Sequence, residues 1–141
     1  ADLVSCYLTA RHAEWLEIYE RRLANASSPI GSILAVFDAY HDHAEFAYER
    51  GFRGCGLLNA AAEFPSGDAG RNAVRVHKEE VEQILVEHLS ALLPNDPNRG
   101  SMVARHLSYL LEGAMSRAGL EGESHRLIEA RTIAQDILRA L

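Results

Sequence analysis

Apolar residues recur at intervals of three and four along almost the whole chain, and this periodicity limits the possible folds more than any other feature. In the first stretch, Leu8, Trp15, Tyr19 and Leu23 fall on one face of a helix, and charged residues cover the other face. Valine and isoleucine occur singly at helical spacing and do not form alternating runs. The pattern predicts amphipathic helices and almost no strand.

Turn-forming residues divide the chain into six periodic stretches. Proline, glycine and small polar residues gather at 27–29, 51–54, 65–68, 94–98 and 119–122, which predicts helices over 2–26, 29–50, 55–64, 69–93, 99–118 and 124–141. The short third stretch is apolar on all sides, so we expect it to be buried. The connections are short, which favours antiparallel neighbours. We predict an all-α, six-helix antiparallel bundle that forms a single domain over residues 1–141.

The charge balance argues against nucleic-acid binding by this chain. The formal net charge is -6, whereas a domain that grips phosphates carries a basic patch. We find no secretory signal and no apolar run of about 20 residues, so we expect a cytoplasmic protein without a membrane partner. Cys6 and Cys55 lie far apart. We interpret them as small buried side chains in a reducing compartment.

Motifs for catalysis or metal binding are missing from the sequence. It contains no HExxH, ExxH or GxSxG, and the glycines at 51–56 lack the Lys-Ser/Thr of a phosphate loop. Asp38 and His41 can share a helix face, which we interpret as a solvated surface. A helical enzyme using Asp38, His41 or His77 would need a metal or cofactor. We predict a protein that is not an enzyme, with no metal site and no cofactor.

Aromatic residues concentrate in the first half of the chain, on faces that point inward. They are compatible with a filled core and equally with a partly hollow bundle that binds a small apolar or aromatic molecule. The inward positions that we predict to line such a site are Trp15, Phe37, Tyr40, Asn59, Phe64, His77 and Leu110.

The last two helices offer more apolar surface than one neighbour needs. Small residues on them permit close helix approach, which favours a twofold homodimer. Coverage of both faces within the monomer is the alternative. The predicted interface residues are Met102, Tyr109, Gly113, Leu127, Ala130, Ala134 and Ile137.

Four segments resemble one family of bacterial regulators. Residues 54–64, Gly-Cys-Gly-Leu-Leu-Asn-Ala-Ala-Ala-Glu-Phe, resemble the G-C-x-L-x-N-x-A-x-E segment of many TetR-type transcriptional regulators. Residues 73–78 are similar to the start of that family's next helix, and Tyr109-Leu-Leu-Glu-Gly-Ala114 to its penultimate helix. Residues 2–8 resemble the start of the long helix that follows the helix-turn-helix. The resemblance therefore spans the whole chain.

The resemblance implies a helical effector-binding and dimerisation domain. In such regulators the last two helices pair with their twofold mates, and an effector in the central pocket moves the linking helix. We expect control of DNA binding, in the family's commoner role of repressor. The helix-turn-helix is missing here, and the chain enters helical periodicity at once without a methionine, so we expect operator contact only through a missing N-terminal domain. A free-standing dimerisation or protein-interaction module without an effector is the alternative.

Overall fold

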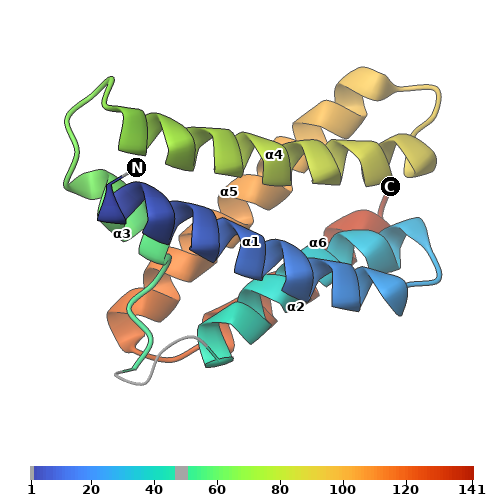
Figure 1. Cartoon of the computed structure of the whole chain (residues 1–141). Helices are drawn as coiled ribbons and strands as arrows, with labels where there is room; N and C mark the ends of the chain where they lie inside the picture. Colours follow the sequence, from blue (N-terminus) through green and yellow to red (C-terminus); the bar gives the residue numbers. More distant parts are fainter. Residues whose placement is uncertain (1, 47–50) are drawn as a thin grey trace.

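The computed structural model of the protein describes residues 2–46 and 51–141, and this part of the chain contains six helices and no strand (Figure 1). The helices are α1 (Leu3–Ala24), α2 (Pro29–Phe46), α3 (Gly56–Ala62), α4 (Ala69–Leu92), α5 (Pro97–Glu121) and α6 (His125–Arg139). The prediction of an all-α fold with six helices is confirmed. Residues 47–50, which we expected at the end of the second helix, lie outside the described residues.

Aspartate caps begin three of the helices. The Asp2 carboxylate accepts a hydrogen bond from the Ser5 backbone N–H at 2.7 Å, and Asp68 accepts one from Gly70 at 2.8 Å. Such caps satisfy backbone donors that have no partner in the first turn of a helix. Asp96 does the same at α5, where Pro97 occupies the first turn. Helix α5 therefore begins two residues before the predicted start.

Helix α5 also runs past its predicted end. We expected residues 119–122 to break the helix, but it continues to Glu121 and ends at Gly122, whose φ is +75°. The prediction was wrong because Gly119 has a packing role inside the helix. A Cβ atom at this position would lie 2.7 Å from the Cα atom of Gly54. Glycine here allows the 51–55 segment to pass close to α5.

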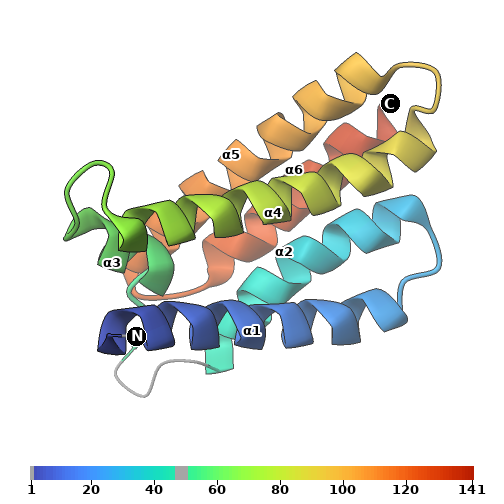
Figure 2. The same cartoon turned by 45° about the horizontal axis from the view of Figure 1, so that its top comes forward.

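Helices α2 and α4 form the middle of the bundle. They contact each other, and both contact α1; on the other side α2 packs against α6 and α4 packs against α5. Figure 2 shows α1 at one edge of this arrangement and α5 at the opposite edge. The first helical residues lie next to α3, and the chain ends near the α4–α5 loop (Figures 1 and 2).

The core contains large side chains from five helices. Those that are almost completely buried are Trp15, Ile33, Val36, Phe37, Leu85, Leu89, Leu107, Leu111 and Leu127. Two expectations about burial were wrong. Helix α3 buries Leu57 and Ala61 but exposes Leu58 and Asn59, because this seven-residue helix packs with one face against its neighbours. Cys55 is buried as expected, whereas Cys6 is exposed on α1.

Within residues 2–46 and 51–141, every helix is too short or too polar to cross a lipid bilayer.

Candidate functional site

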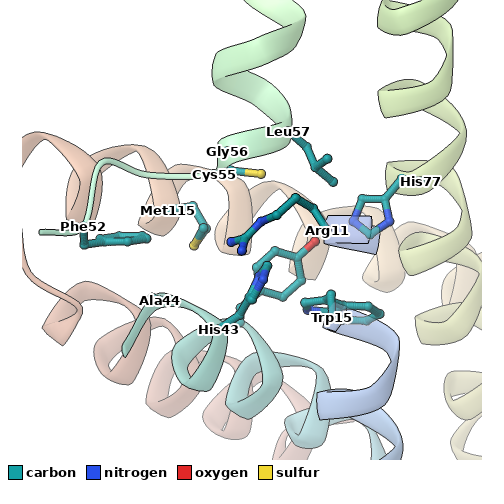
Figure 3. Close-up of a pocket in the computed structure, with 11 residues that line it drawn as sticks. Arg11, Trp15, His43, Ala44, Phe52, Cys55, Gly56, Leu57, His77 and Met115 are labelled. Atoms are coloured by element: carbon teal, nitrogen blue, oxygen red, sulfur yellow. The ribbon is translucent and has the colours of Figure 1, made fainter. Parts of the chain in front are cut away.

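A small cavity lies where α1, α2 and α4 meet the segment that leads into α3 (Figure 3). Its volume is about 20 Å³, which is enough for a single water molecule. Most of the wall is aromatic or aliphatic, with a few polar groups among them. The lining residues are Arg11, Trp15, Tyr40, His43, Ala44, Phe52, Cys55, Gly56, Leu57, His77 and Met115.

Trp15 organises the aromatic side of this cavity. Its ring stacks on Tyr19 at a centroid distance of 5.4 Å, and it contacts Tyr40 at 5.3 Å and the edge of His77 at 5.8 Å. Its Nε1 atom is buried and has no hydrogen-bond acceptor among the described residues. A buried N–H group without an acceptor is uncommon in proteins. The cavity wall therefore includes a hydrogen-bond donor that a ligand oxygen could satisfy.

A wider groove lies beside the cavity, between α1, α3 and α4. Its volume is about 250 Å³, and Leu8, Leu57 and Val74 are among its apolar lining residues. His77 and Leu57 line both the groove and the cavity. These two side chains therefore form the wall between the two hollows.

His77 is part of a short chain of polar side chains on this wall. Its Nδ1 atom contacts Nδ1 of His12, and the Nε2 atom of His12 lies 2.9 Å from a carboxylate oxygen of Glu80. Burial lowers the pKa of His77 to about 3, and electrostatic interactions with Lys78, His12 and His43 act in the same direction. His77 is therefore a neutral imidazole at pH 7.

Lys78 holds a second polar cluster behind the cavity. Its Nζ atom lies 2.8 Å from Oε1 of Glu112, 3.4 Å from the Tyr40 hydroxyl and 3.5 Å from the Cys55 sulfur. Burial alone would lower the pKa of Lys78, but the nearby Tyr40, Cys55 and Glu112 outweigh burial and raise it. For Tyr40, burial is the main cause of a raised pKa, because it disfavours the charged phenolate. At neutral pH this cluster therefore holds an ammonium group on Lys78 and a protonated phenol on Tyr40.

A third polar group lies at the edge of the cavity. Oε2 of Glu14 accepts a hydrogen bond from Nη1 of Arg11 at 2.7 Å and lies 3.1 Å from Nε2 of His43. The Arg11 side chain is only 14% exposed, whereas that of Glu14 is 48% exposed. Figure 3 shows the guanidinium group pointing in among the lining side chains. A single glutamate on α1 thus contacts a cation of its own helix and a histidine of α2.

Comparisons with known proteins identify similarity to a solved structure. No family model matches the sequence, and no curated protein does. The crystal structure of SCO4454, a TetR-family transcriptional regulator from Streptomyces coelicolor, matches with a TM-score of 0.84 and 26% sequence identity. The alignment covers 99% of this chain and 71% of that one. The chain has the fold of a TetR-family regulator. The family resemblance of the sequence motifs is thereby confirmed.

Of the residues predicted to line a ligand site, three come together. Trp15, Tyr40 and His77 line the cavity. Phe37 is buried in the adjoining core and is not among the cavity-lining residues.

The other three predicted residues lie elsewhere. Asn59 is exposed and donates a hydrogen bond to the Arg53 carbonyl oxygen, so the expectation that it faces inward was wrong. Phe64 is half-buried and packs close to Gly70 at the start of α4. Leu110 lines the shallow groove between α5 and α6.

Several cavity residues were not predicted from the sequence, although helical spacing places two of them on the correct face. Arg11 lies one turn before Trp15, and His43 lies one turn after Tyr40, so each shares a helix face with a residue that we had selected. Phe52 and Met115 gave no such signal. Only the tertiary contacts bring their segments to the cavity.

The residues predicted for a dimer interface divide into two groups. Met102, Tyr109 and Gly113 are exposed on α5, and Ile137 is half-buried. Leu127, Ala130 and Ala134 are buried within the chain, and the expectation that they are available to a partner was wrong. Helix α6 packs against both α2 and α5, so its apolar stripe is largely covered internally.

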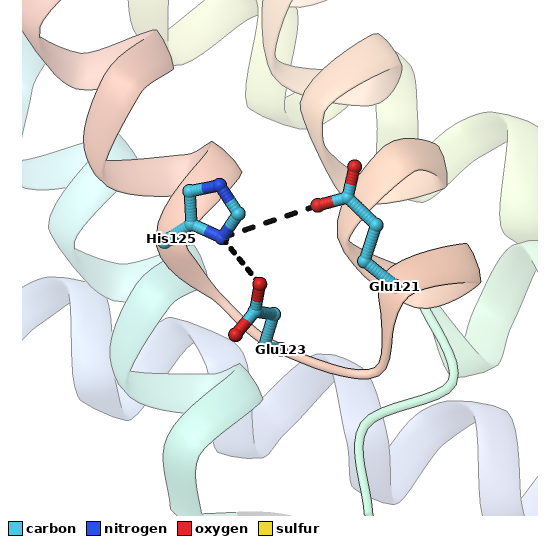
Figure 4. A group of neighbouring side chains, drawn as sticks. All are labelled: Glu121, Glu123 and His125. Atoms are coloured by element: carbon cyan, nitrogen blue, oxygen red, sulfur yellow. Dashed lines mark ion pairs between the residues drawn. The ribbon is translucent and has the colours of Figure 1, made fainter.

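Three ionisable side chains gather at the α5–α6 turn (Figure 4). Nδ1 of His125 lies 3.9 Å from Glu121 and 2.9 Å from Glu123, a grouping that could hold a cation. However, Nε of Arg126 donates to both carboxylate oxygens of Glu121 at 3.0 and 3.1 Å. We interpret the group as a surface ion-pair network in which an arginine already neutralises Glu121.

Proposed function

We propose that this chain is the regulatory domain of a TetR-type transcriptional regulator that responds to a small, largely apolar effector. The structural match to a TetR-family regulator over 99% of the chain carries this proposal. The cavity and the adjoining groove support it, since both are mainly apolar and contain a few polar groups that could orient a ligand. Such a domain does not catalyse a reaction.

Helix α1 is the part of the domain through which an effector would act. It contributes Arg11 and Trp15 to the cavity and Leu8 and His12 to the groove. A ligand in either hollow therefore contacts α1 directly. An effector that favours one position of α1 would shift the protein between DNA-binding and non-binding arrangements. In this proposal an N-terminal helix-turn-helix domain binds the operator. We expect the regulator to act as a repressor in the cytoplasm.

Dimerisation through α5 and α6 is a further part of the proposal. Met102 and Tyr109 are 67% and 68% exposed on α5, and Ile133 on α6 is 48% exposed. Tyr109, Gly113 and Ile133 line a shallow groove between the two helices. Large exposed apolar side chains in one patch are typical of an interface. A second copy of the chain could pair with this face by twofold symmetry.

A free-standing dimerisation module is the second candidate function. The small volume of the cavity, about 20 Å³, favours it, because a filled core needs no effector. Thermal unfolding in the presence of a library of apolar compounds distinguishes the two functions. We expect at least one compound to raise the melting temperature, and we expect His77→Ala and Tyr40→Ala to reduce this effect. His106→Ala serves as the control, because His106 is exposed on α5. If no compound stabilises the protein, the dimerisation module becomes the better explanation.

A further inference from the structure

We propose that the effector is a small apolar carboxylic acid whose carboxylate replaces Glu14 on Arg11. The inference rests on the proposed function, because it assigns a chemical class and a mode of action to the effector of that same site.

Two hydrogen-bond donors from α1 converge on the cavity. Arg11 and Trp15 are one helical turn apart, and both line it (Figure 3). The guanidinium group is planar and presents paired N–H groups that match a carboxylate. The indole Nε1 is buried without an acceptor among the described residues. A ligand oxygen near this atom would satisfy a donor that the protein itself leaves unsatisfied.

Glu14 shows that this part of α1 accommodates a carboxylate. One oxygen of Glu14 contacts both Arg11 and His43, at 2.7 and 3.1 Å. The Glu14 side chain is 48% exposed, so it can turn toward solvent. Exchange with an effector carboxylate would keep Arg11 paired. Binding would therefore avoid the large cost of a buried and unpaired charge.

The second cation near the cavity, Lys78, has a more buried carboxylate partner than Arg11 has. Lys78 lies 2.8 Å from the carboxylate of Glu112, and this ion pair comes from α4 and α5. The Glu112 side chain is 27% exposed, against 48% for Glu14, so an incoming anion displaces Glu14 from Arg11 more easily than Glu112 from Lys78.

The cavity walls suit an apolar body attached to the carboxylate. Phe52 and Met115 present aromatic and thioether surfaces on the side of the guanidinium group (Figure 3), and Tyr40 lines the same cavity. The present volume of about 20 Å³ holds only a water molecule, so an alkyl or aryl group requires side-chain movement. Methionine adapts readily to such changes because its side chain is flexible.

Displacement of Glu14 gives the effector a direct influence on α1. Glu14 links α1 to α2 through its contact with His43. When the effector occupies Arg11, this contact is lost and α1 is held less firmly against α2. Binding of the acid would thus favour a different position of α1 through contacts made only in that state.

The only tryptophan of the chain provides the measurement, because Trp15 lines the cavity. We would follow its fluorescence while adding octanoate or 4-phenylbutyrate to the protein, and then their neutral amides. We expect the acids to bind on the order of tenfold more tightly than the amides. Arg11→Gln should weaken binding of the acids by about tenfold and leave the amides unaffected. Glu14→Gln should tighten binding of the acids severalfold, because it removes the competing carboxylate.

Two further variants control the test. Arg21→Gln removes an exposed arginine from the same helix and should leave the affinity for the acids unchanged. Arg11→Lys retains the charge but loses the paired geometry, so it should give an intermediate affinity. Thermal unfolding establishes that each variant is folded. If Arg11→Gln does not fold, the opposite effect expected of Glu14→Gln still tests the proposal.

The outcomes separate this inference from the proposed function. Equal binding of acids and amides would overturn the carboxylate assignment and leave the effector site in place. Absence of binding by either acid would also overturn it, and the library screen described above would then decide the proposed function independently.

Discussion

Gly119 of α5 and Gly54 of the α2–α3 segment lie against each other with no space for a side chain between them. A Cβ atom at position 119 would lie 2.7 Å from both the Cα and the backbone nitrogen of Gly54. Backbone atoms cannot move aside as a flexible side chain can. We therefore expect Gly119→Ala to destabilise the protein by about 1–3 kcal/mol, as measured by urea unfolding.

Gly100 provides the matched control in the same helix. A Cβ atom there would have its nearest neighbour, the Cβ of Leu89, at 3.9 Å, which is ordinary contact. Gly100→Ala should stabilise the protein by up to about 1 kcal/mol, because alanine favours the helix. Equal destabilisation by both substitutions would show that the close approach at Gly119 is unimportant.

The buried histidine predicts a loss of stability in acid. The pKa of His77 is about 3 in the folded protein and about 6.5 in an unfolded chain. The unfolded state therefore binds more protons below pH 6.5, and stability falls as the pH decreases toward the folded value. Between about pH 7.5 and about pH 5 this group should account for a loss of about 2 kcal/mol. Urea unfolding at both pH values measures it.

A variant without the buried imidazole identifies the source of this loss. His77→Leu should reduce the difference in unfolding free energy between the two pH values by most of that amount. His106→Leu, at an exposed position of α5, should retain it. An unchanged pH dependence in His77→Leu would contradict the assignment.

The ion pair between Lys78 and Glu112 predicts a non-additive pair of substitutions. Their side chains are 18% and 27% exposed, so the pair is partly screened by water. Lys78→Met should destabilise the protein by on the order of 2 kcal/mol, because it leaves the Glu112 carboxylate without its cation. The double variant Lys78→Met/Glu112→Leu should recover most of this loss. Additive free energies of unfolding in the double-mutant cycle would show that the pair does not interact.

The proposed dimer face predicts a change in oligomeric state without a change in fold. No described atom lies within 4 Å of a Cβ built at Gly113, so Gly113→Leu should be tolerated by the monomer. In the dimer it should overpack a close helix contact and weaken association by about 1–3 kcal/mol. Sedimentation velocity at micromolar concentration measures this change. Leu3→Glu, at an exposed position on α1, should leave association unchanged, and a Gly113→Leu protein that remains fully dimeric would exclude this face.

The helices themselves could be predicted from the sequence because their causes are local. Periodic apolar residues define the buried face of each helix, and aspartate or proline defines several starts. The prediction failed at Gly119, where a glycine that resembles a helix end serves a contact with residue 54. It also failed for α3, because composition alone does not show how many faces of a short helix are covered.

The candidate site was only partly predictable for a related reason. Periodicity placed Trp15, Tyr40 and His77 on inward faces, and these three residues do line the cavity. It could not show that Asn59 turns outward to the Arg53 carbonyl. Nor could it show that Leu127, Ala130 and Ala134 are covered by other helices of the same chain.

By itself, the sequence determined that this chain forms six helices and that it resembles the TetR-type regulators. Both follow from patterns within single segments. Only the tertiary structure decided which polar groups meet at the cavity, because Arg11, His43 and Met115 belong to three different helices. Their proximity depends on how helices pack against one another, and that packing reflects contacts between residues far apart in the chain.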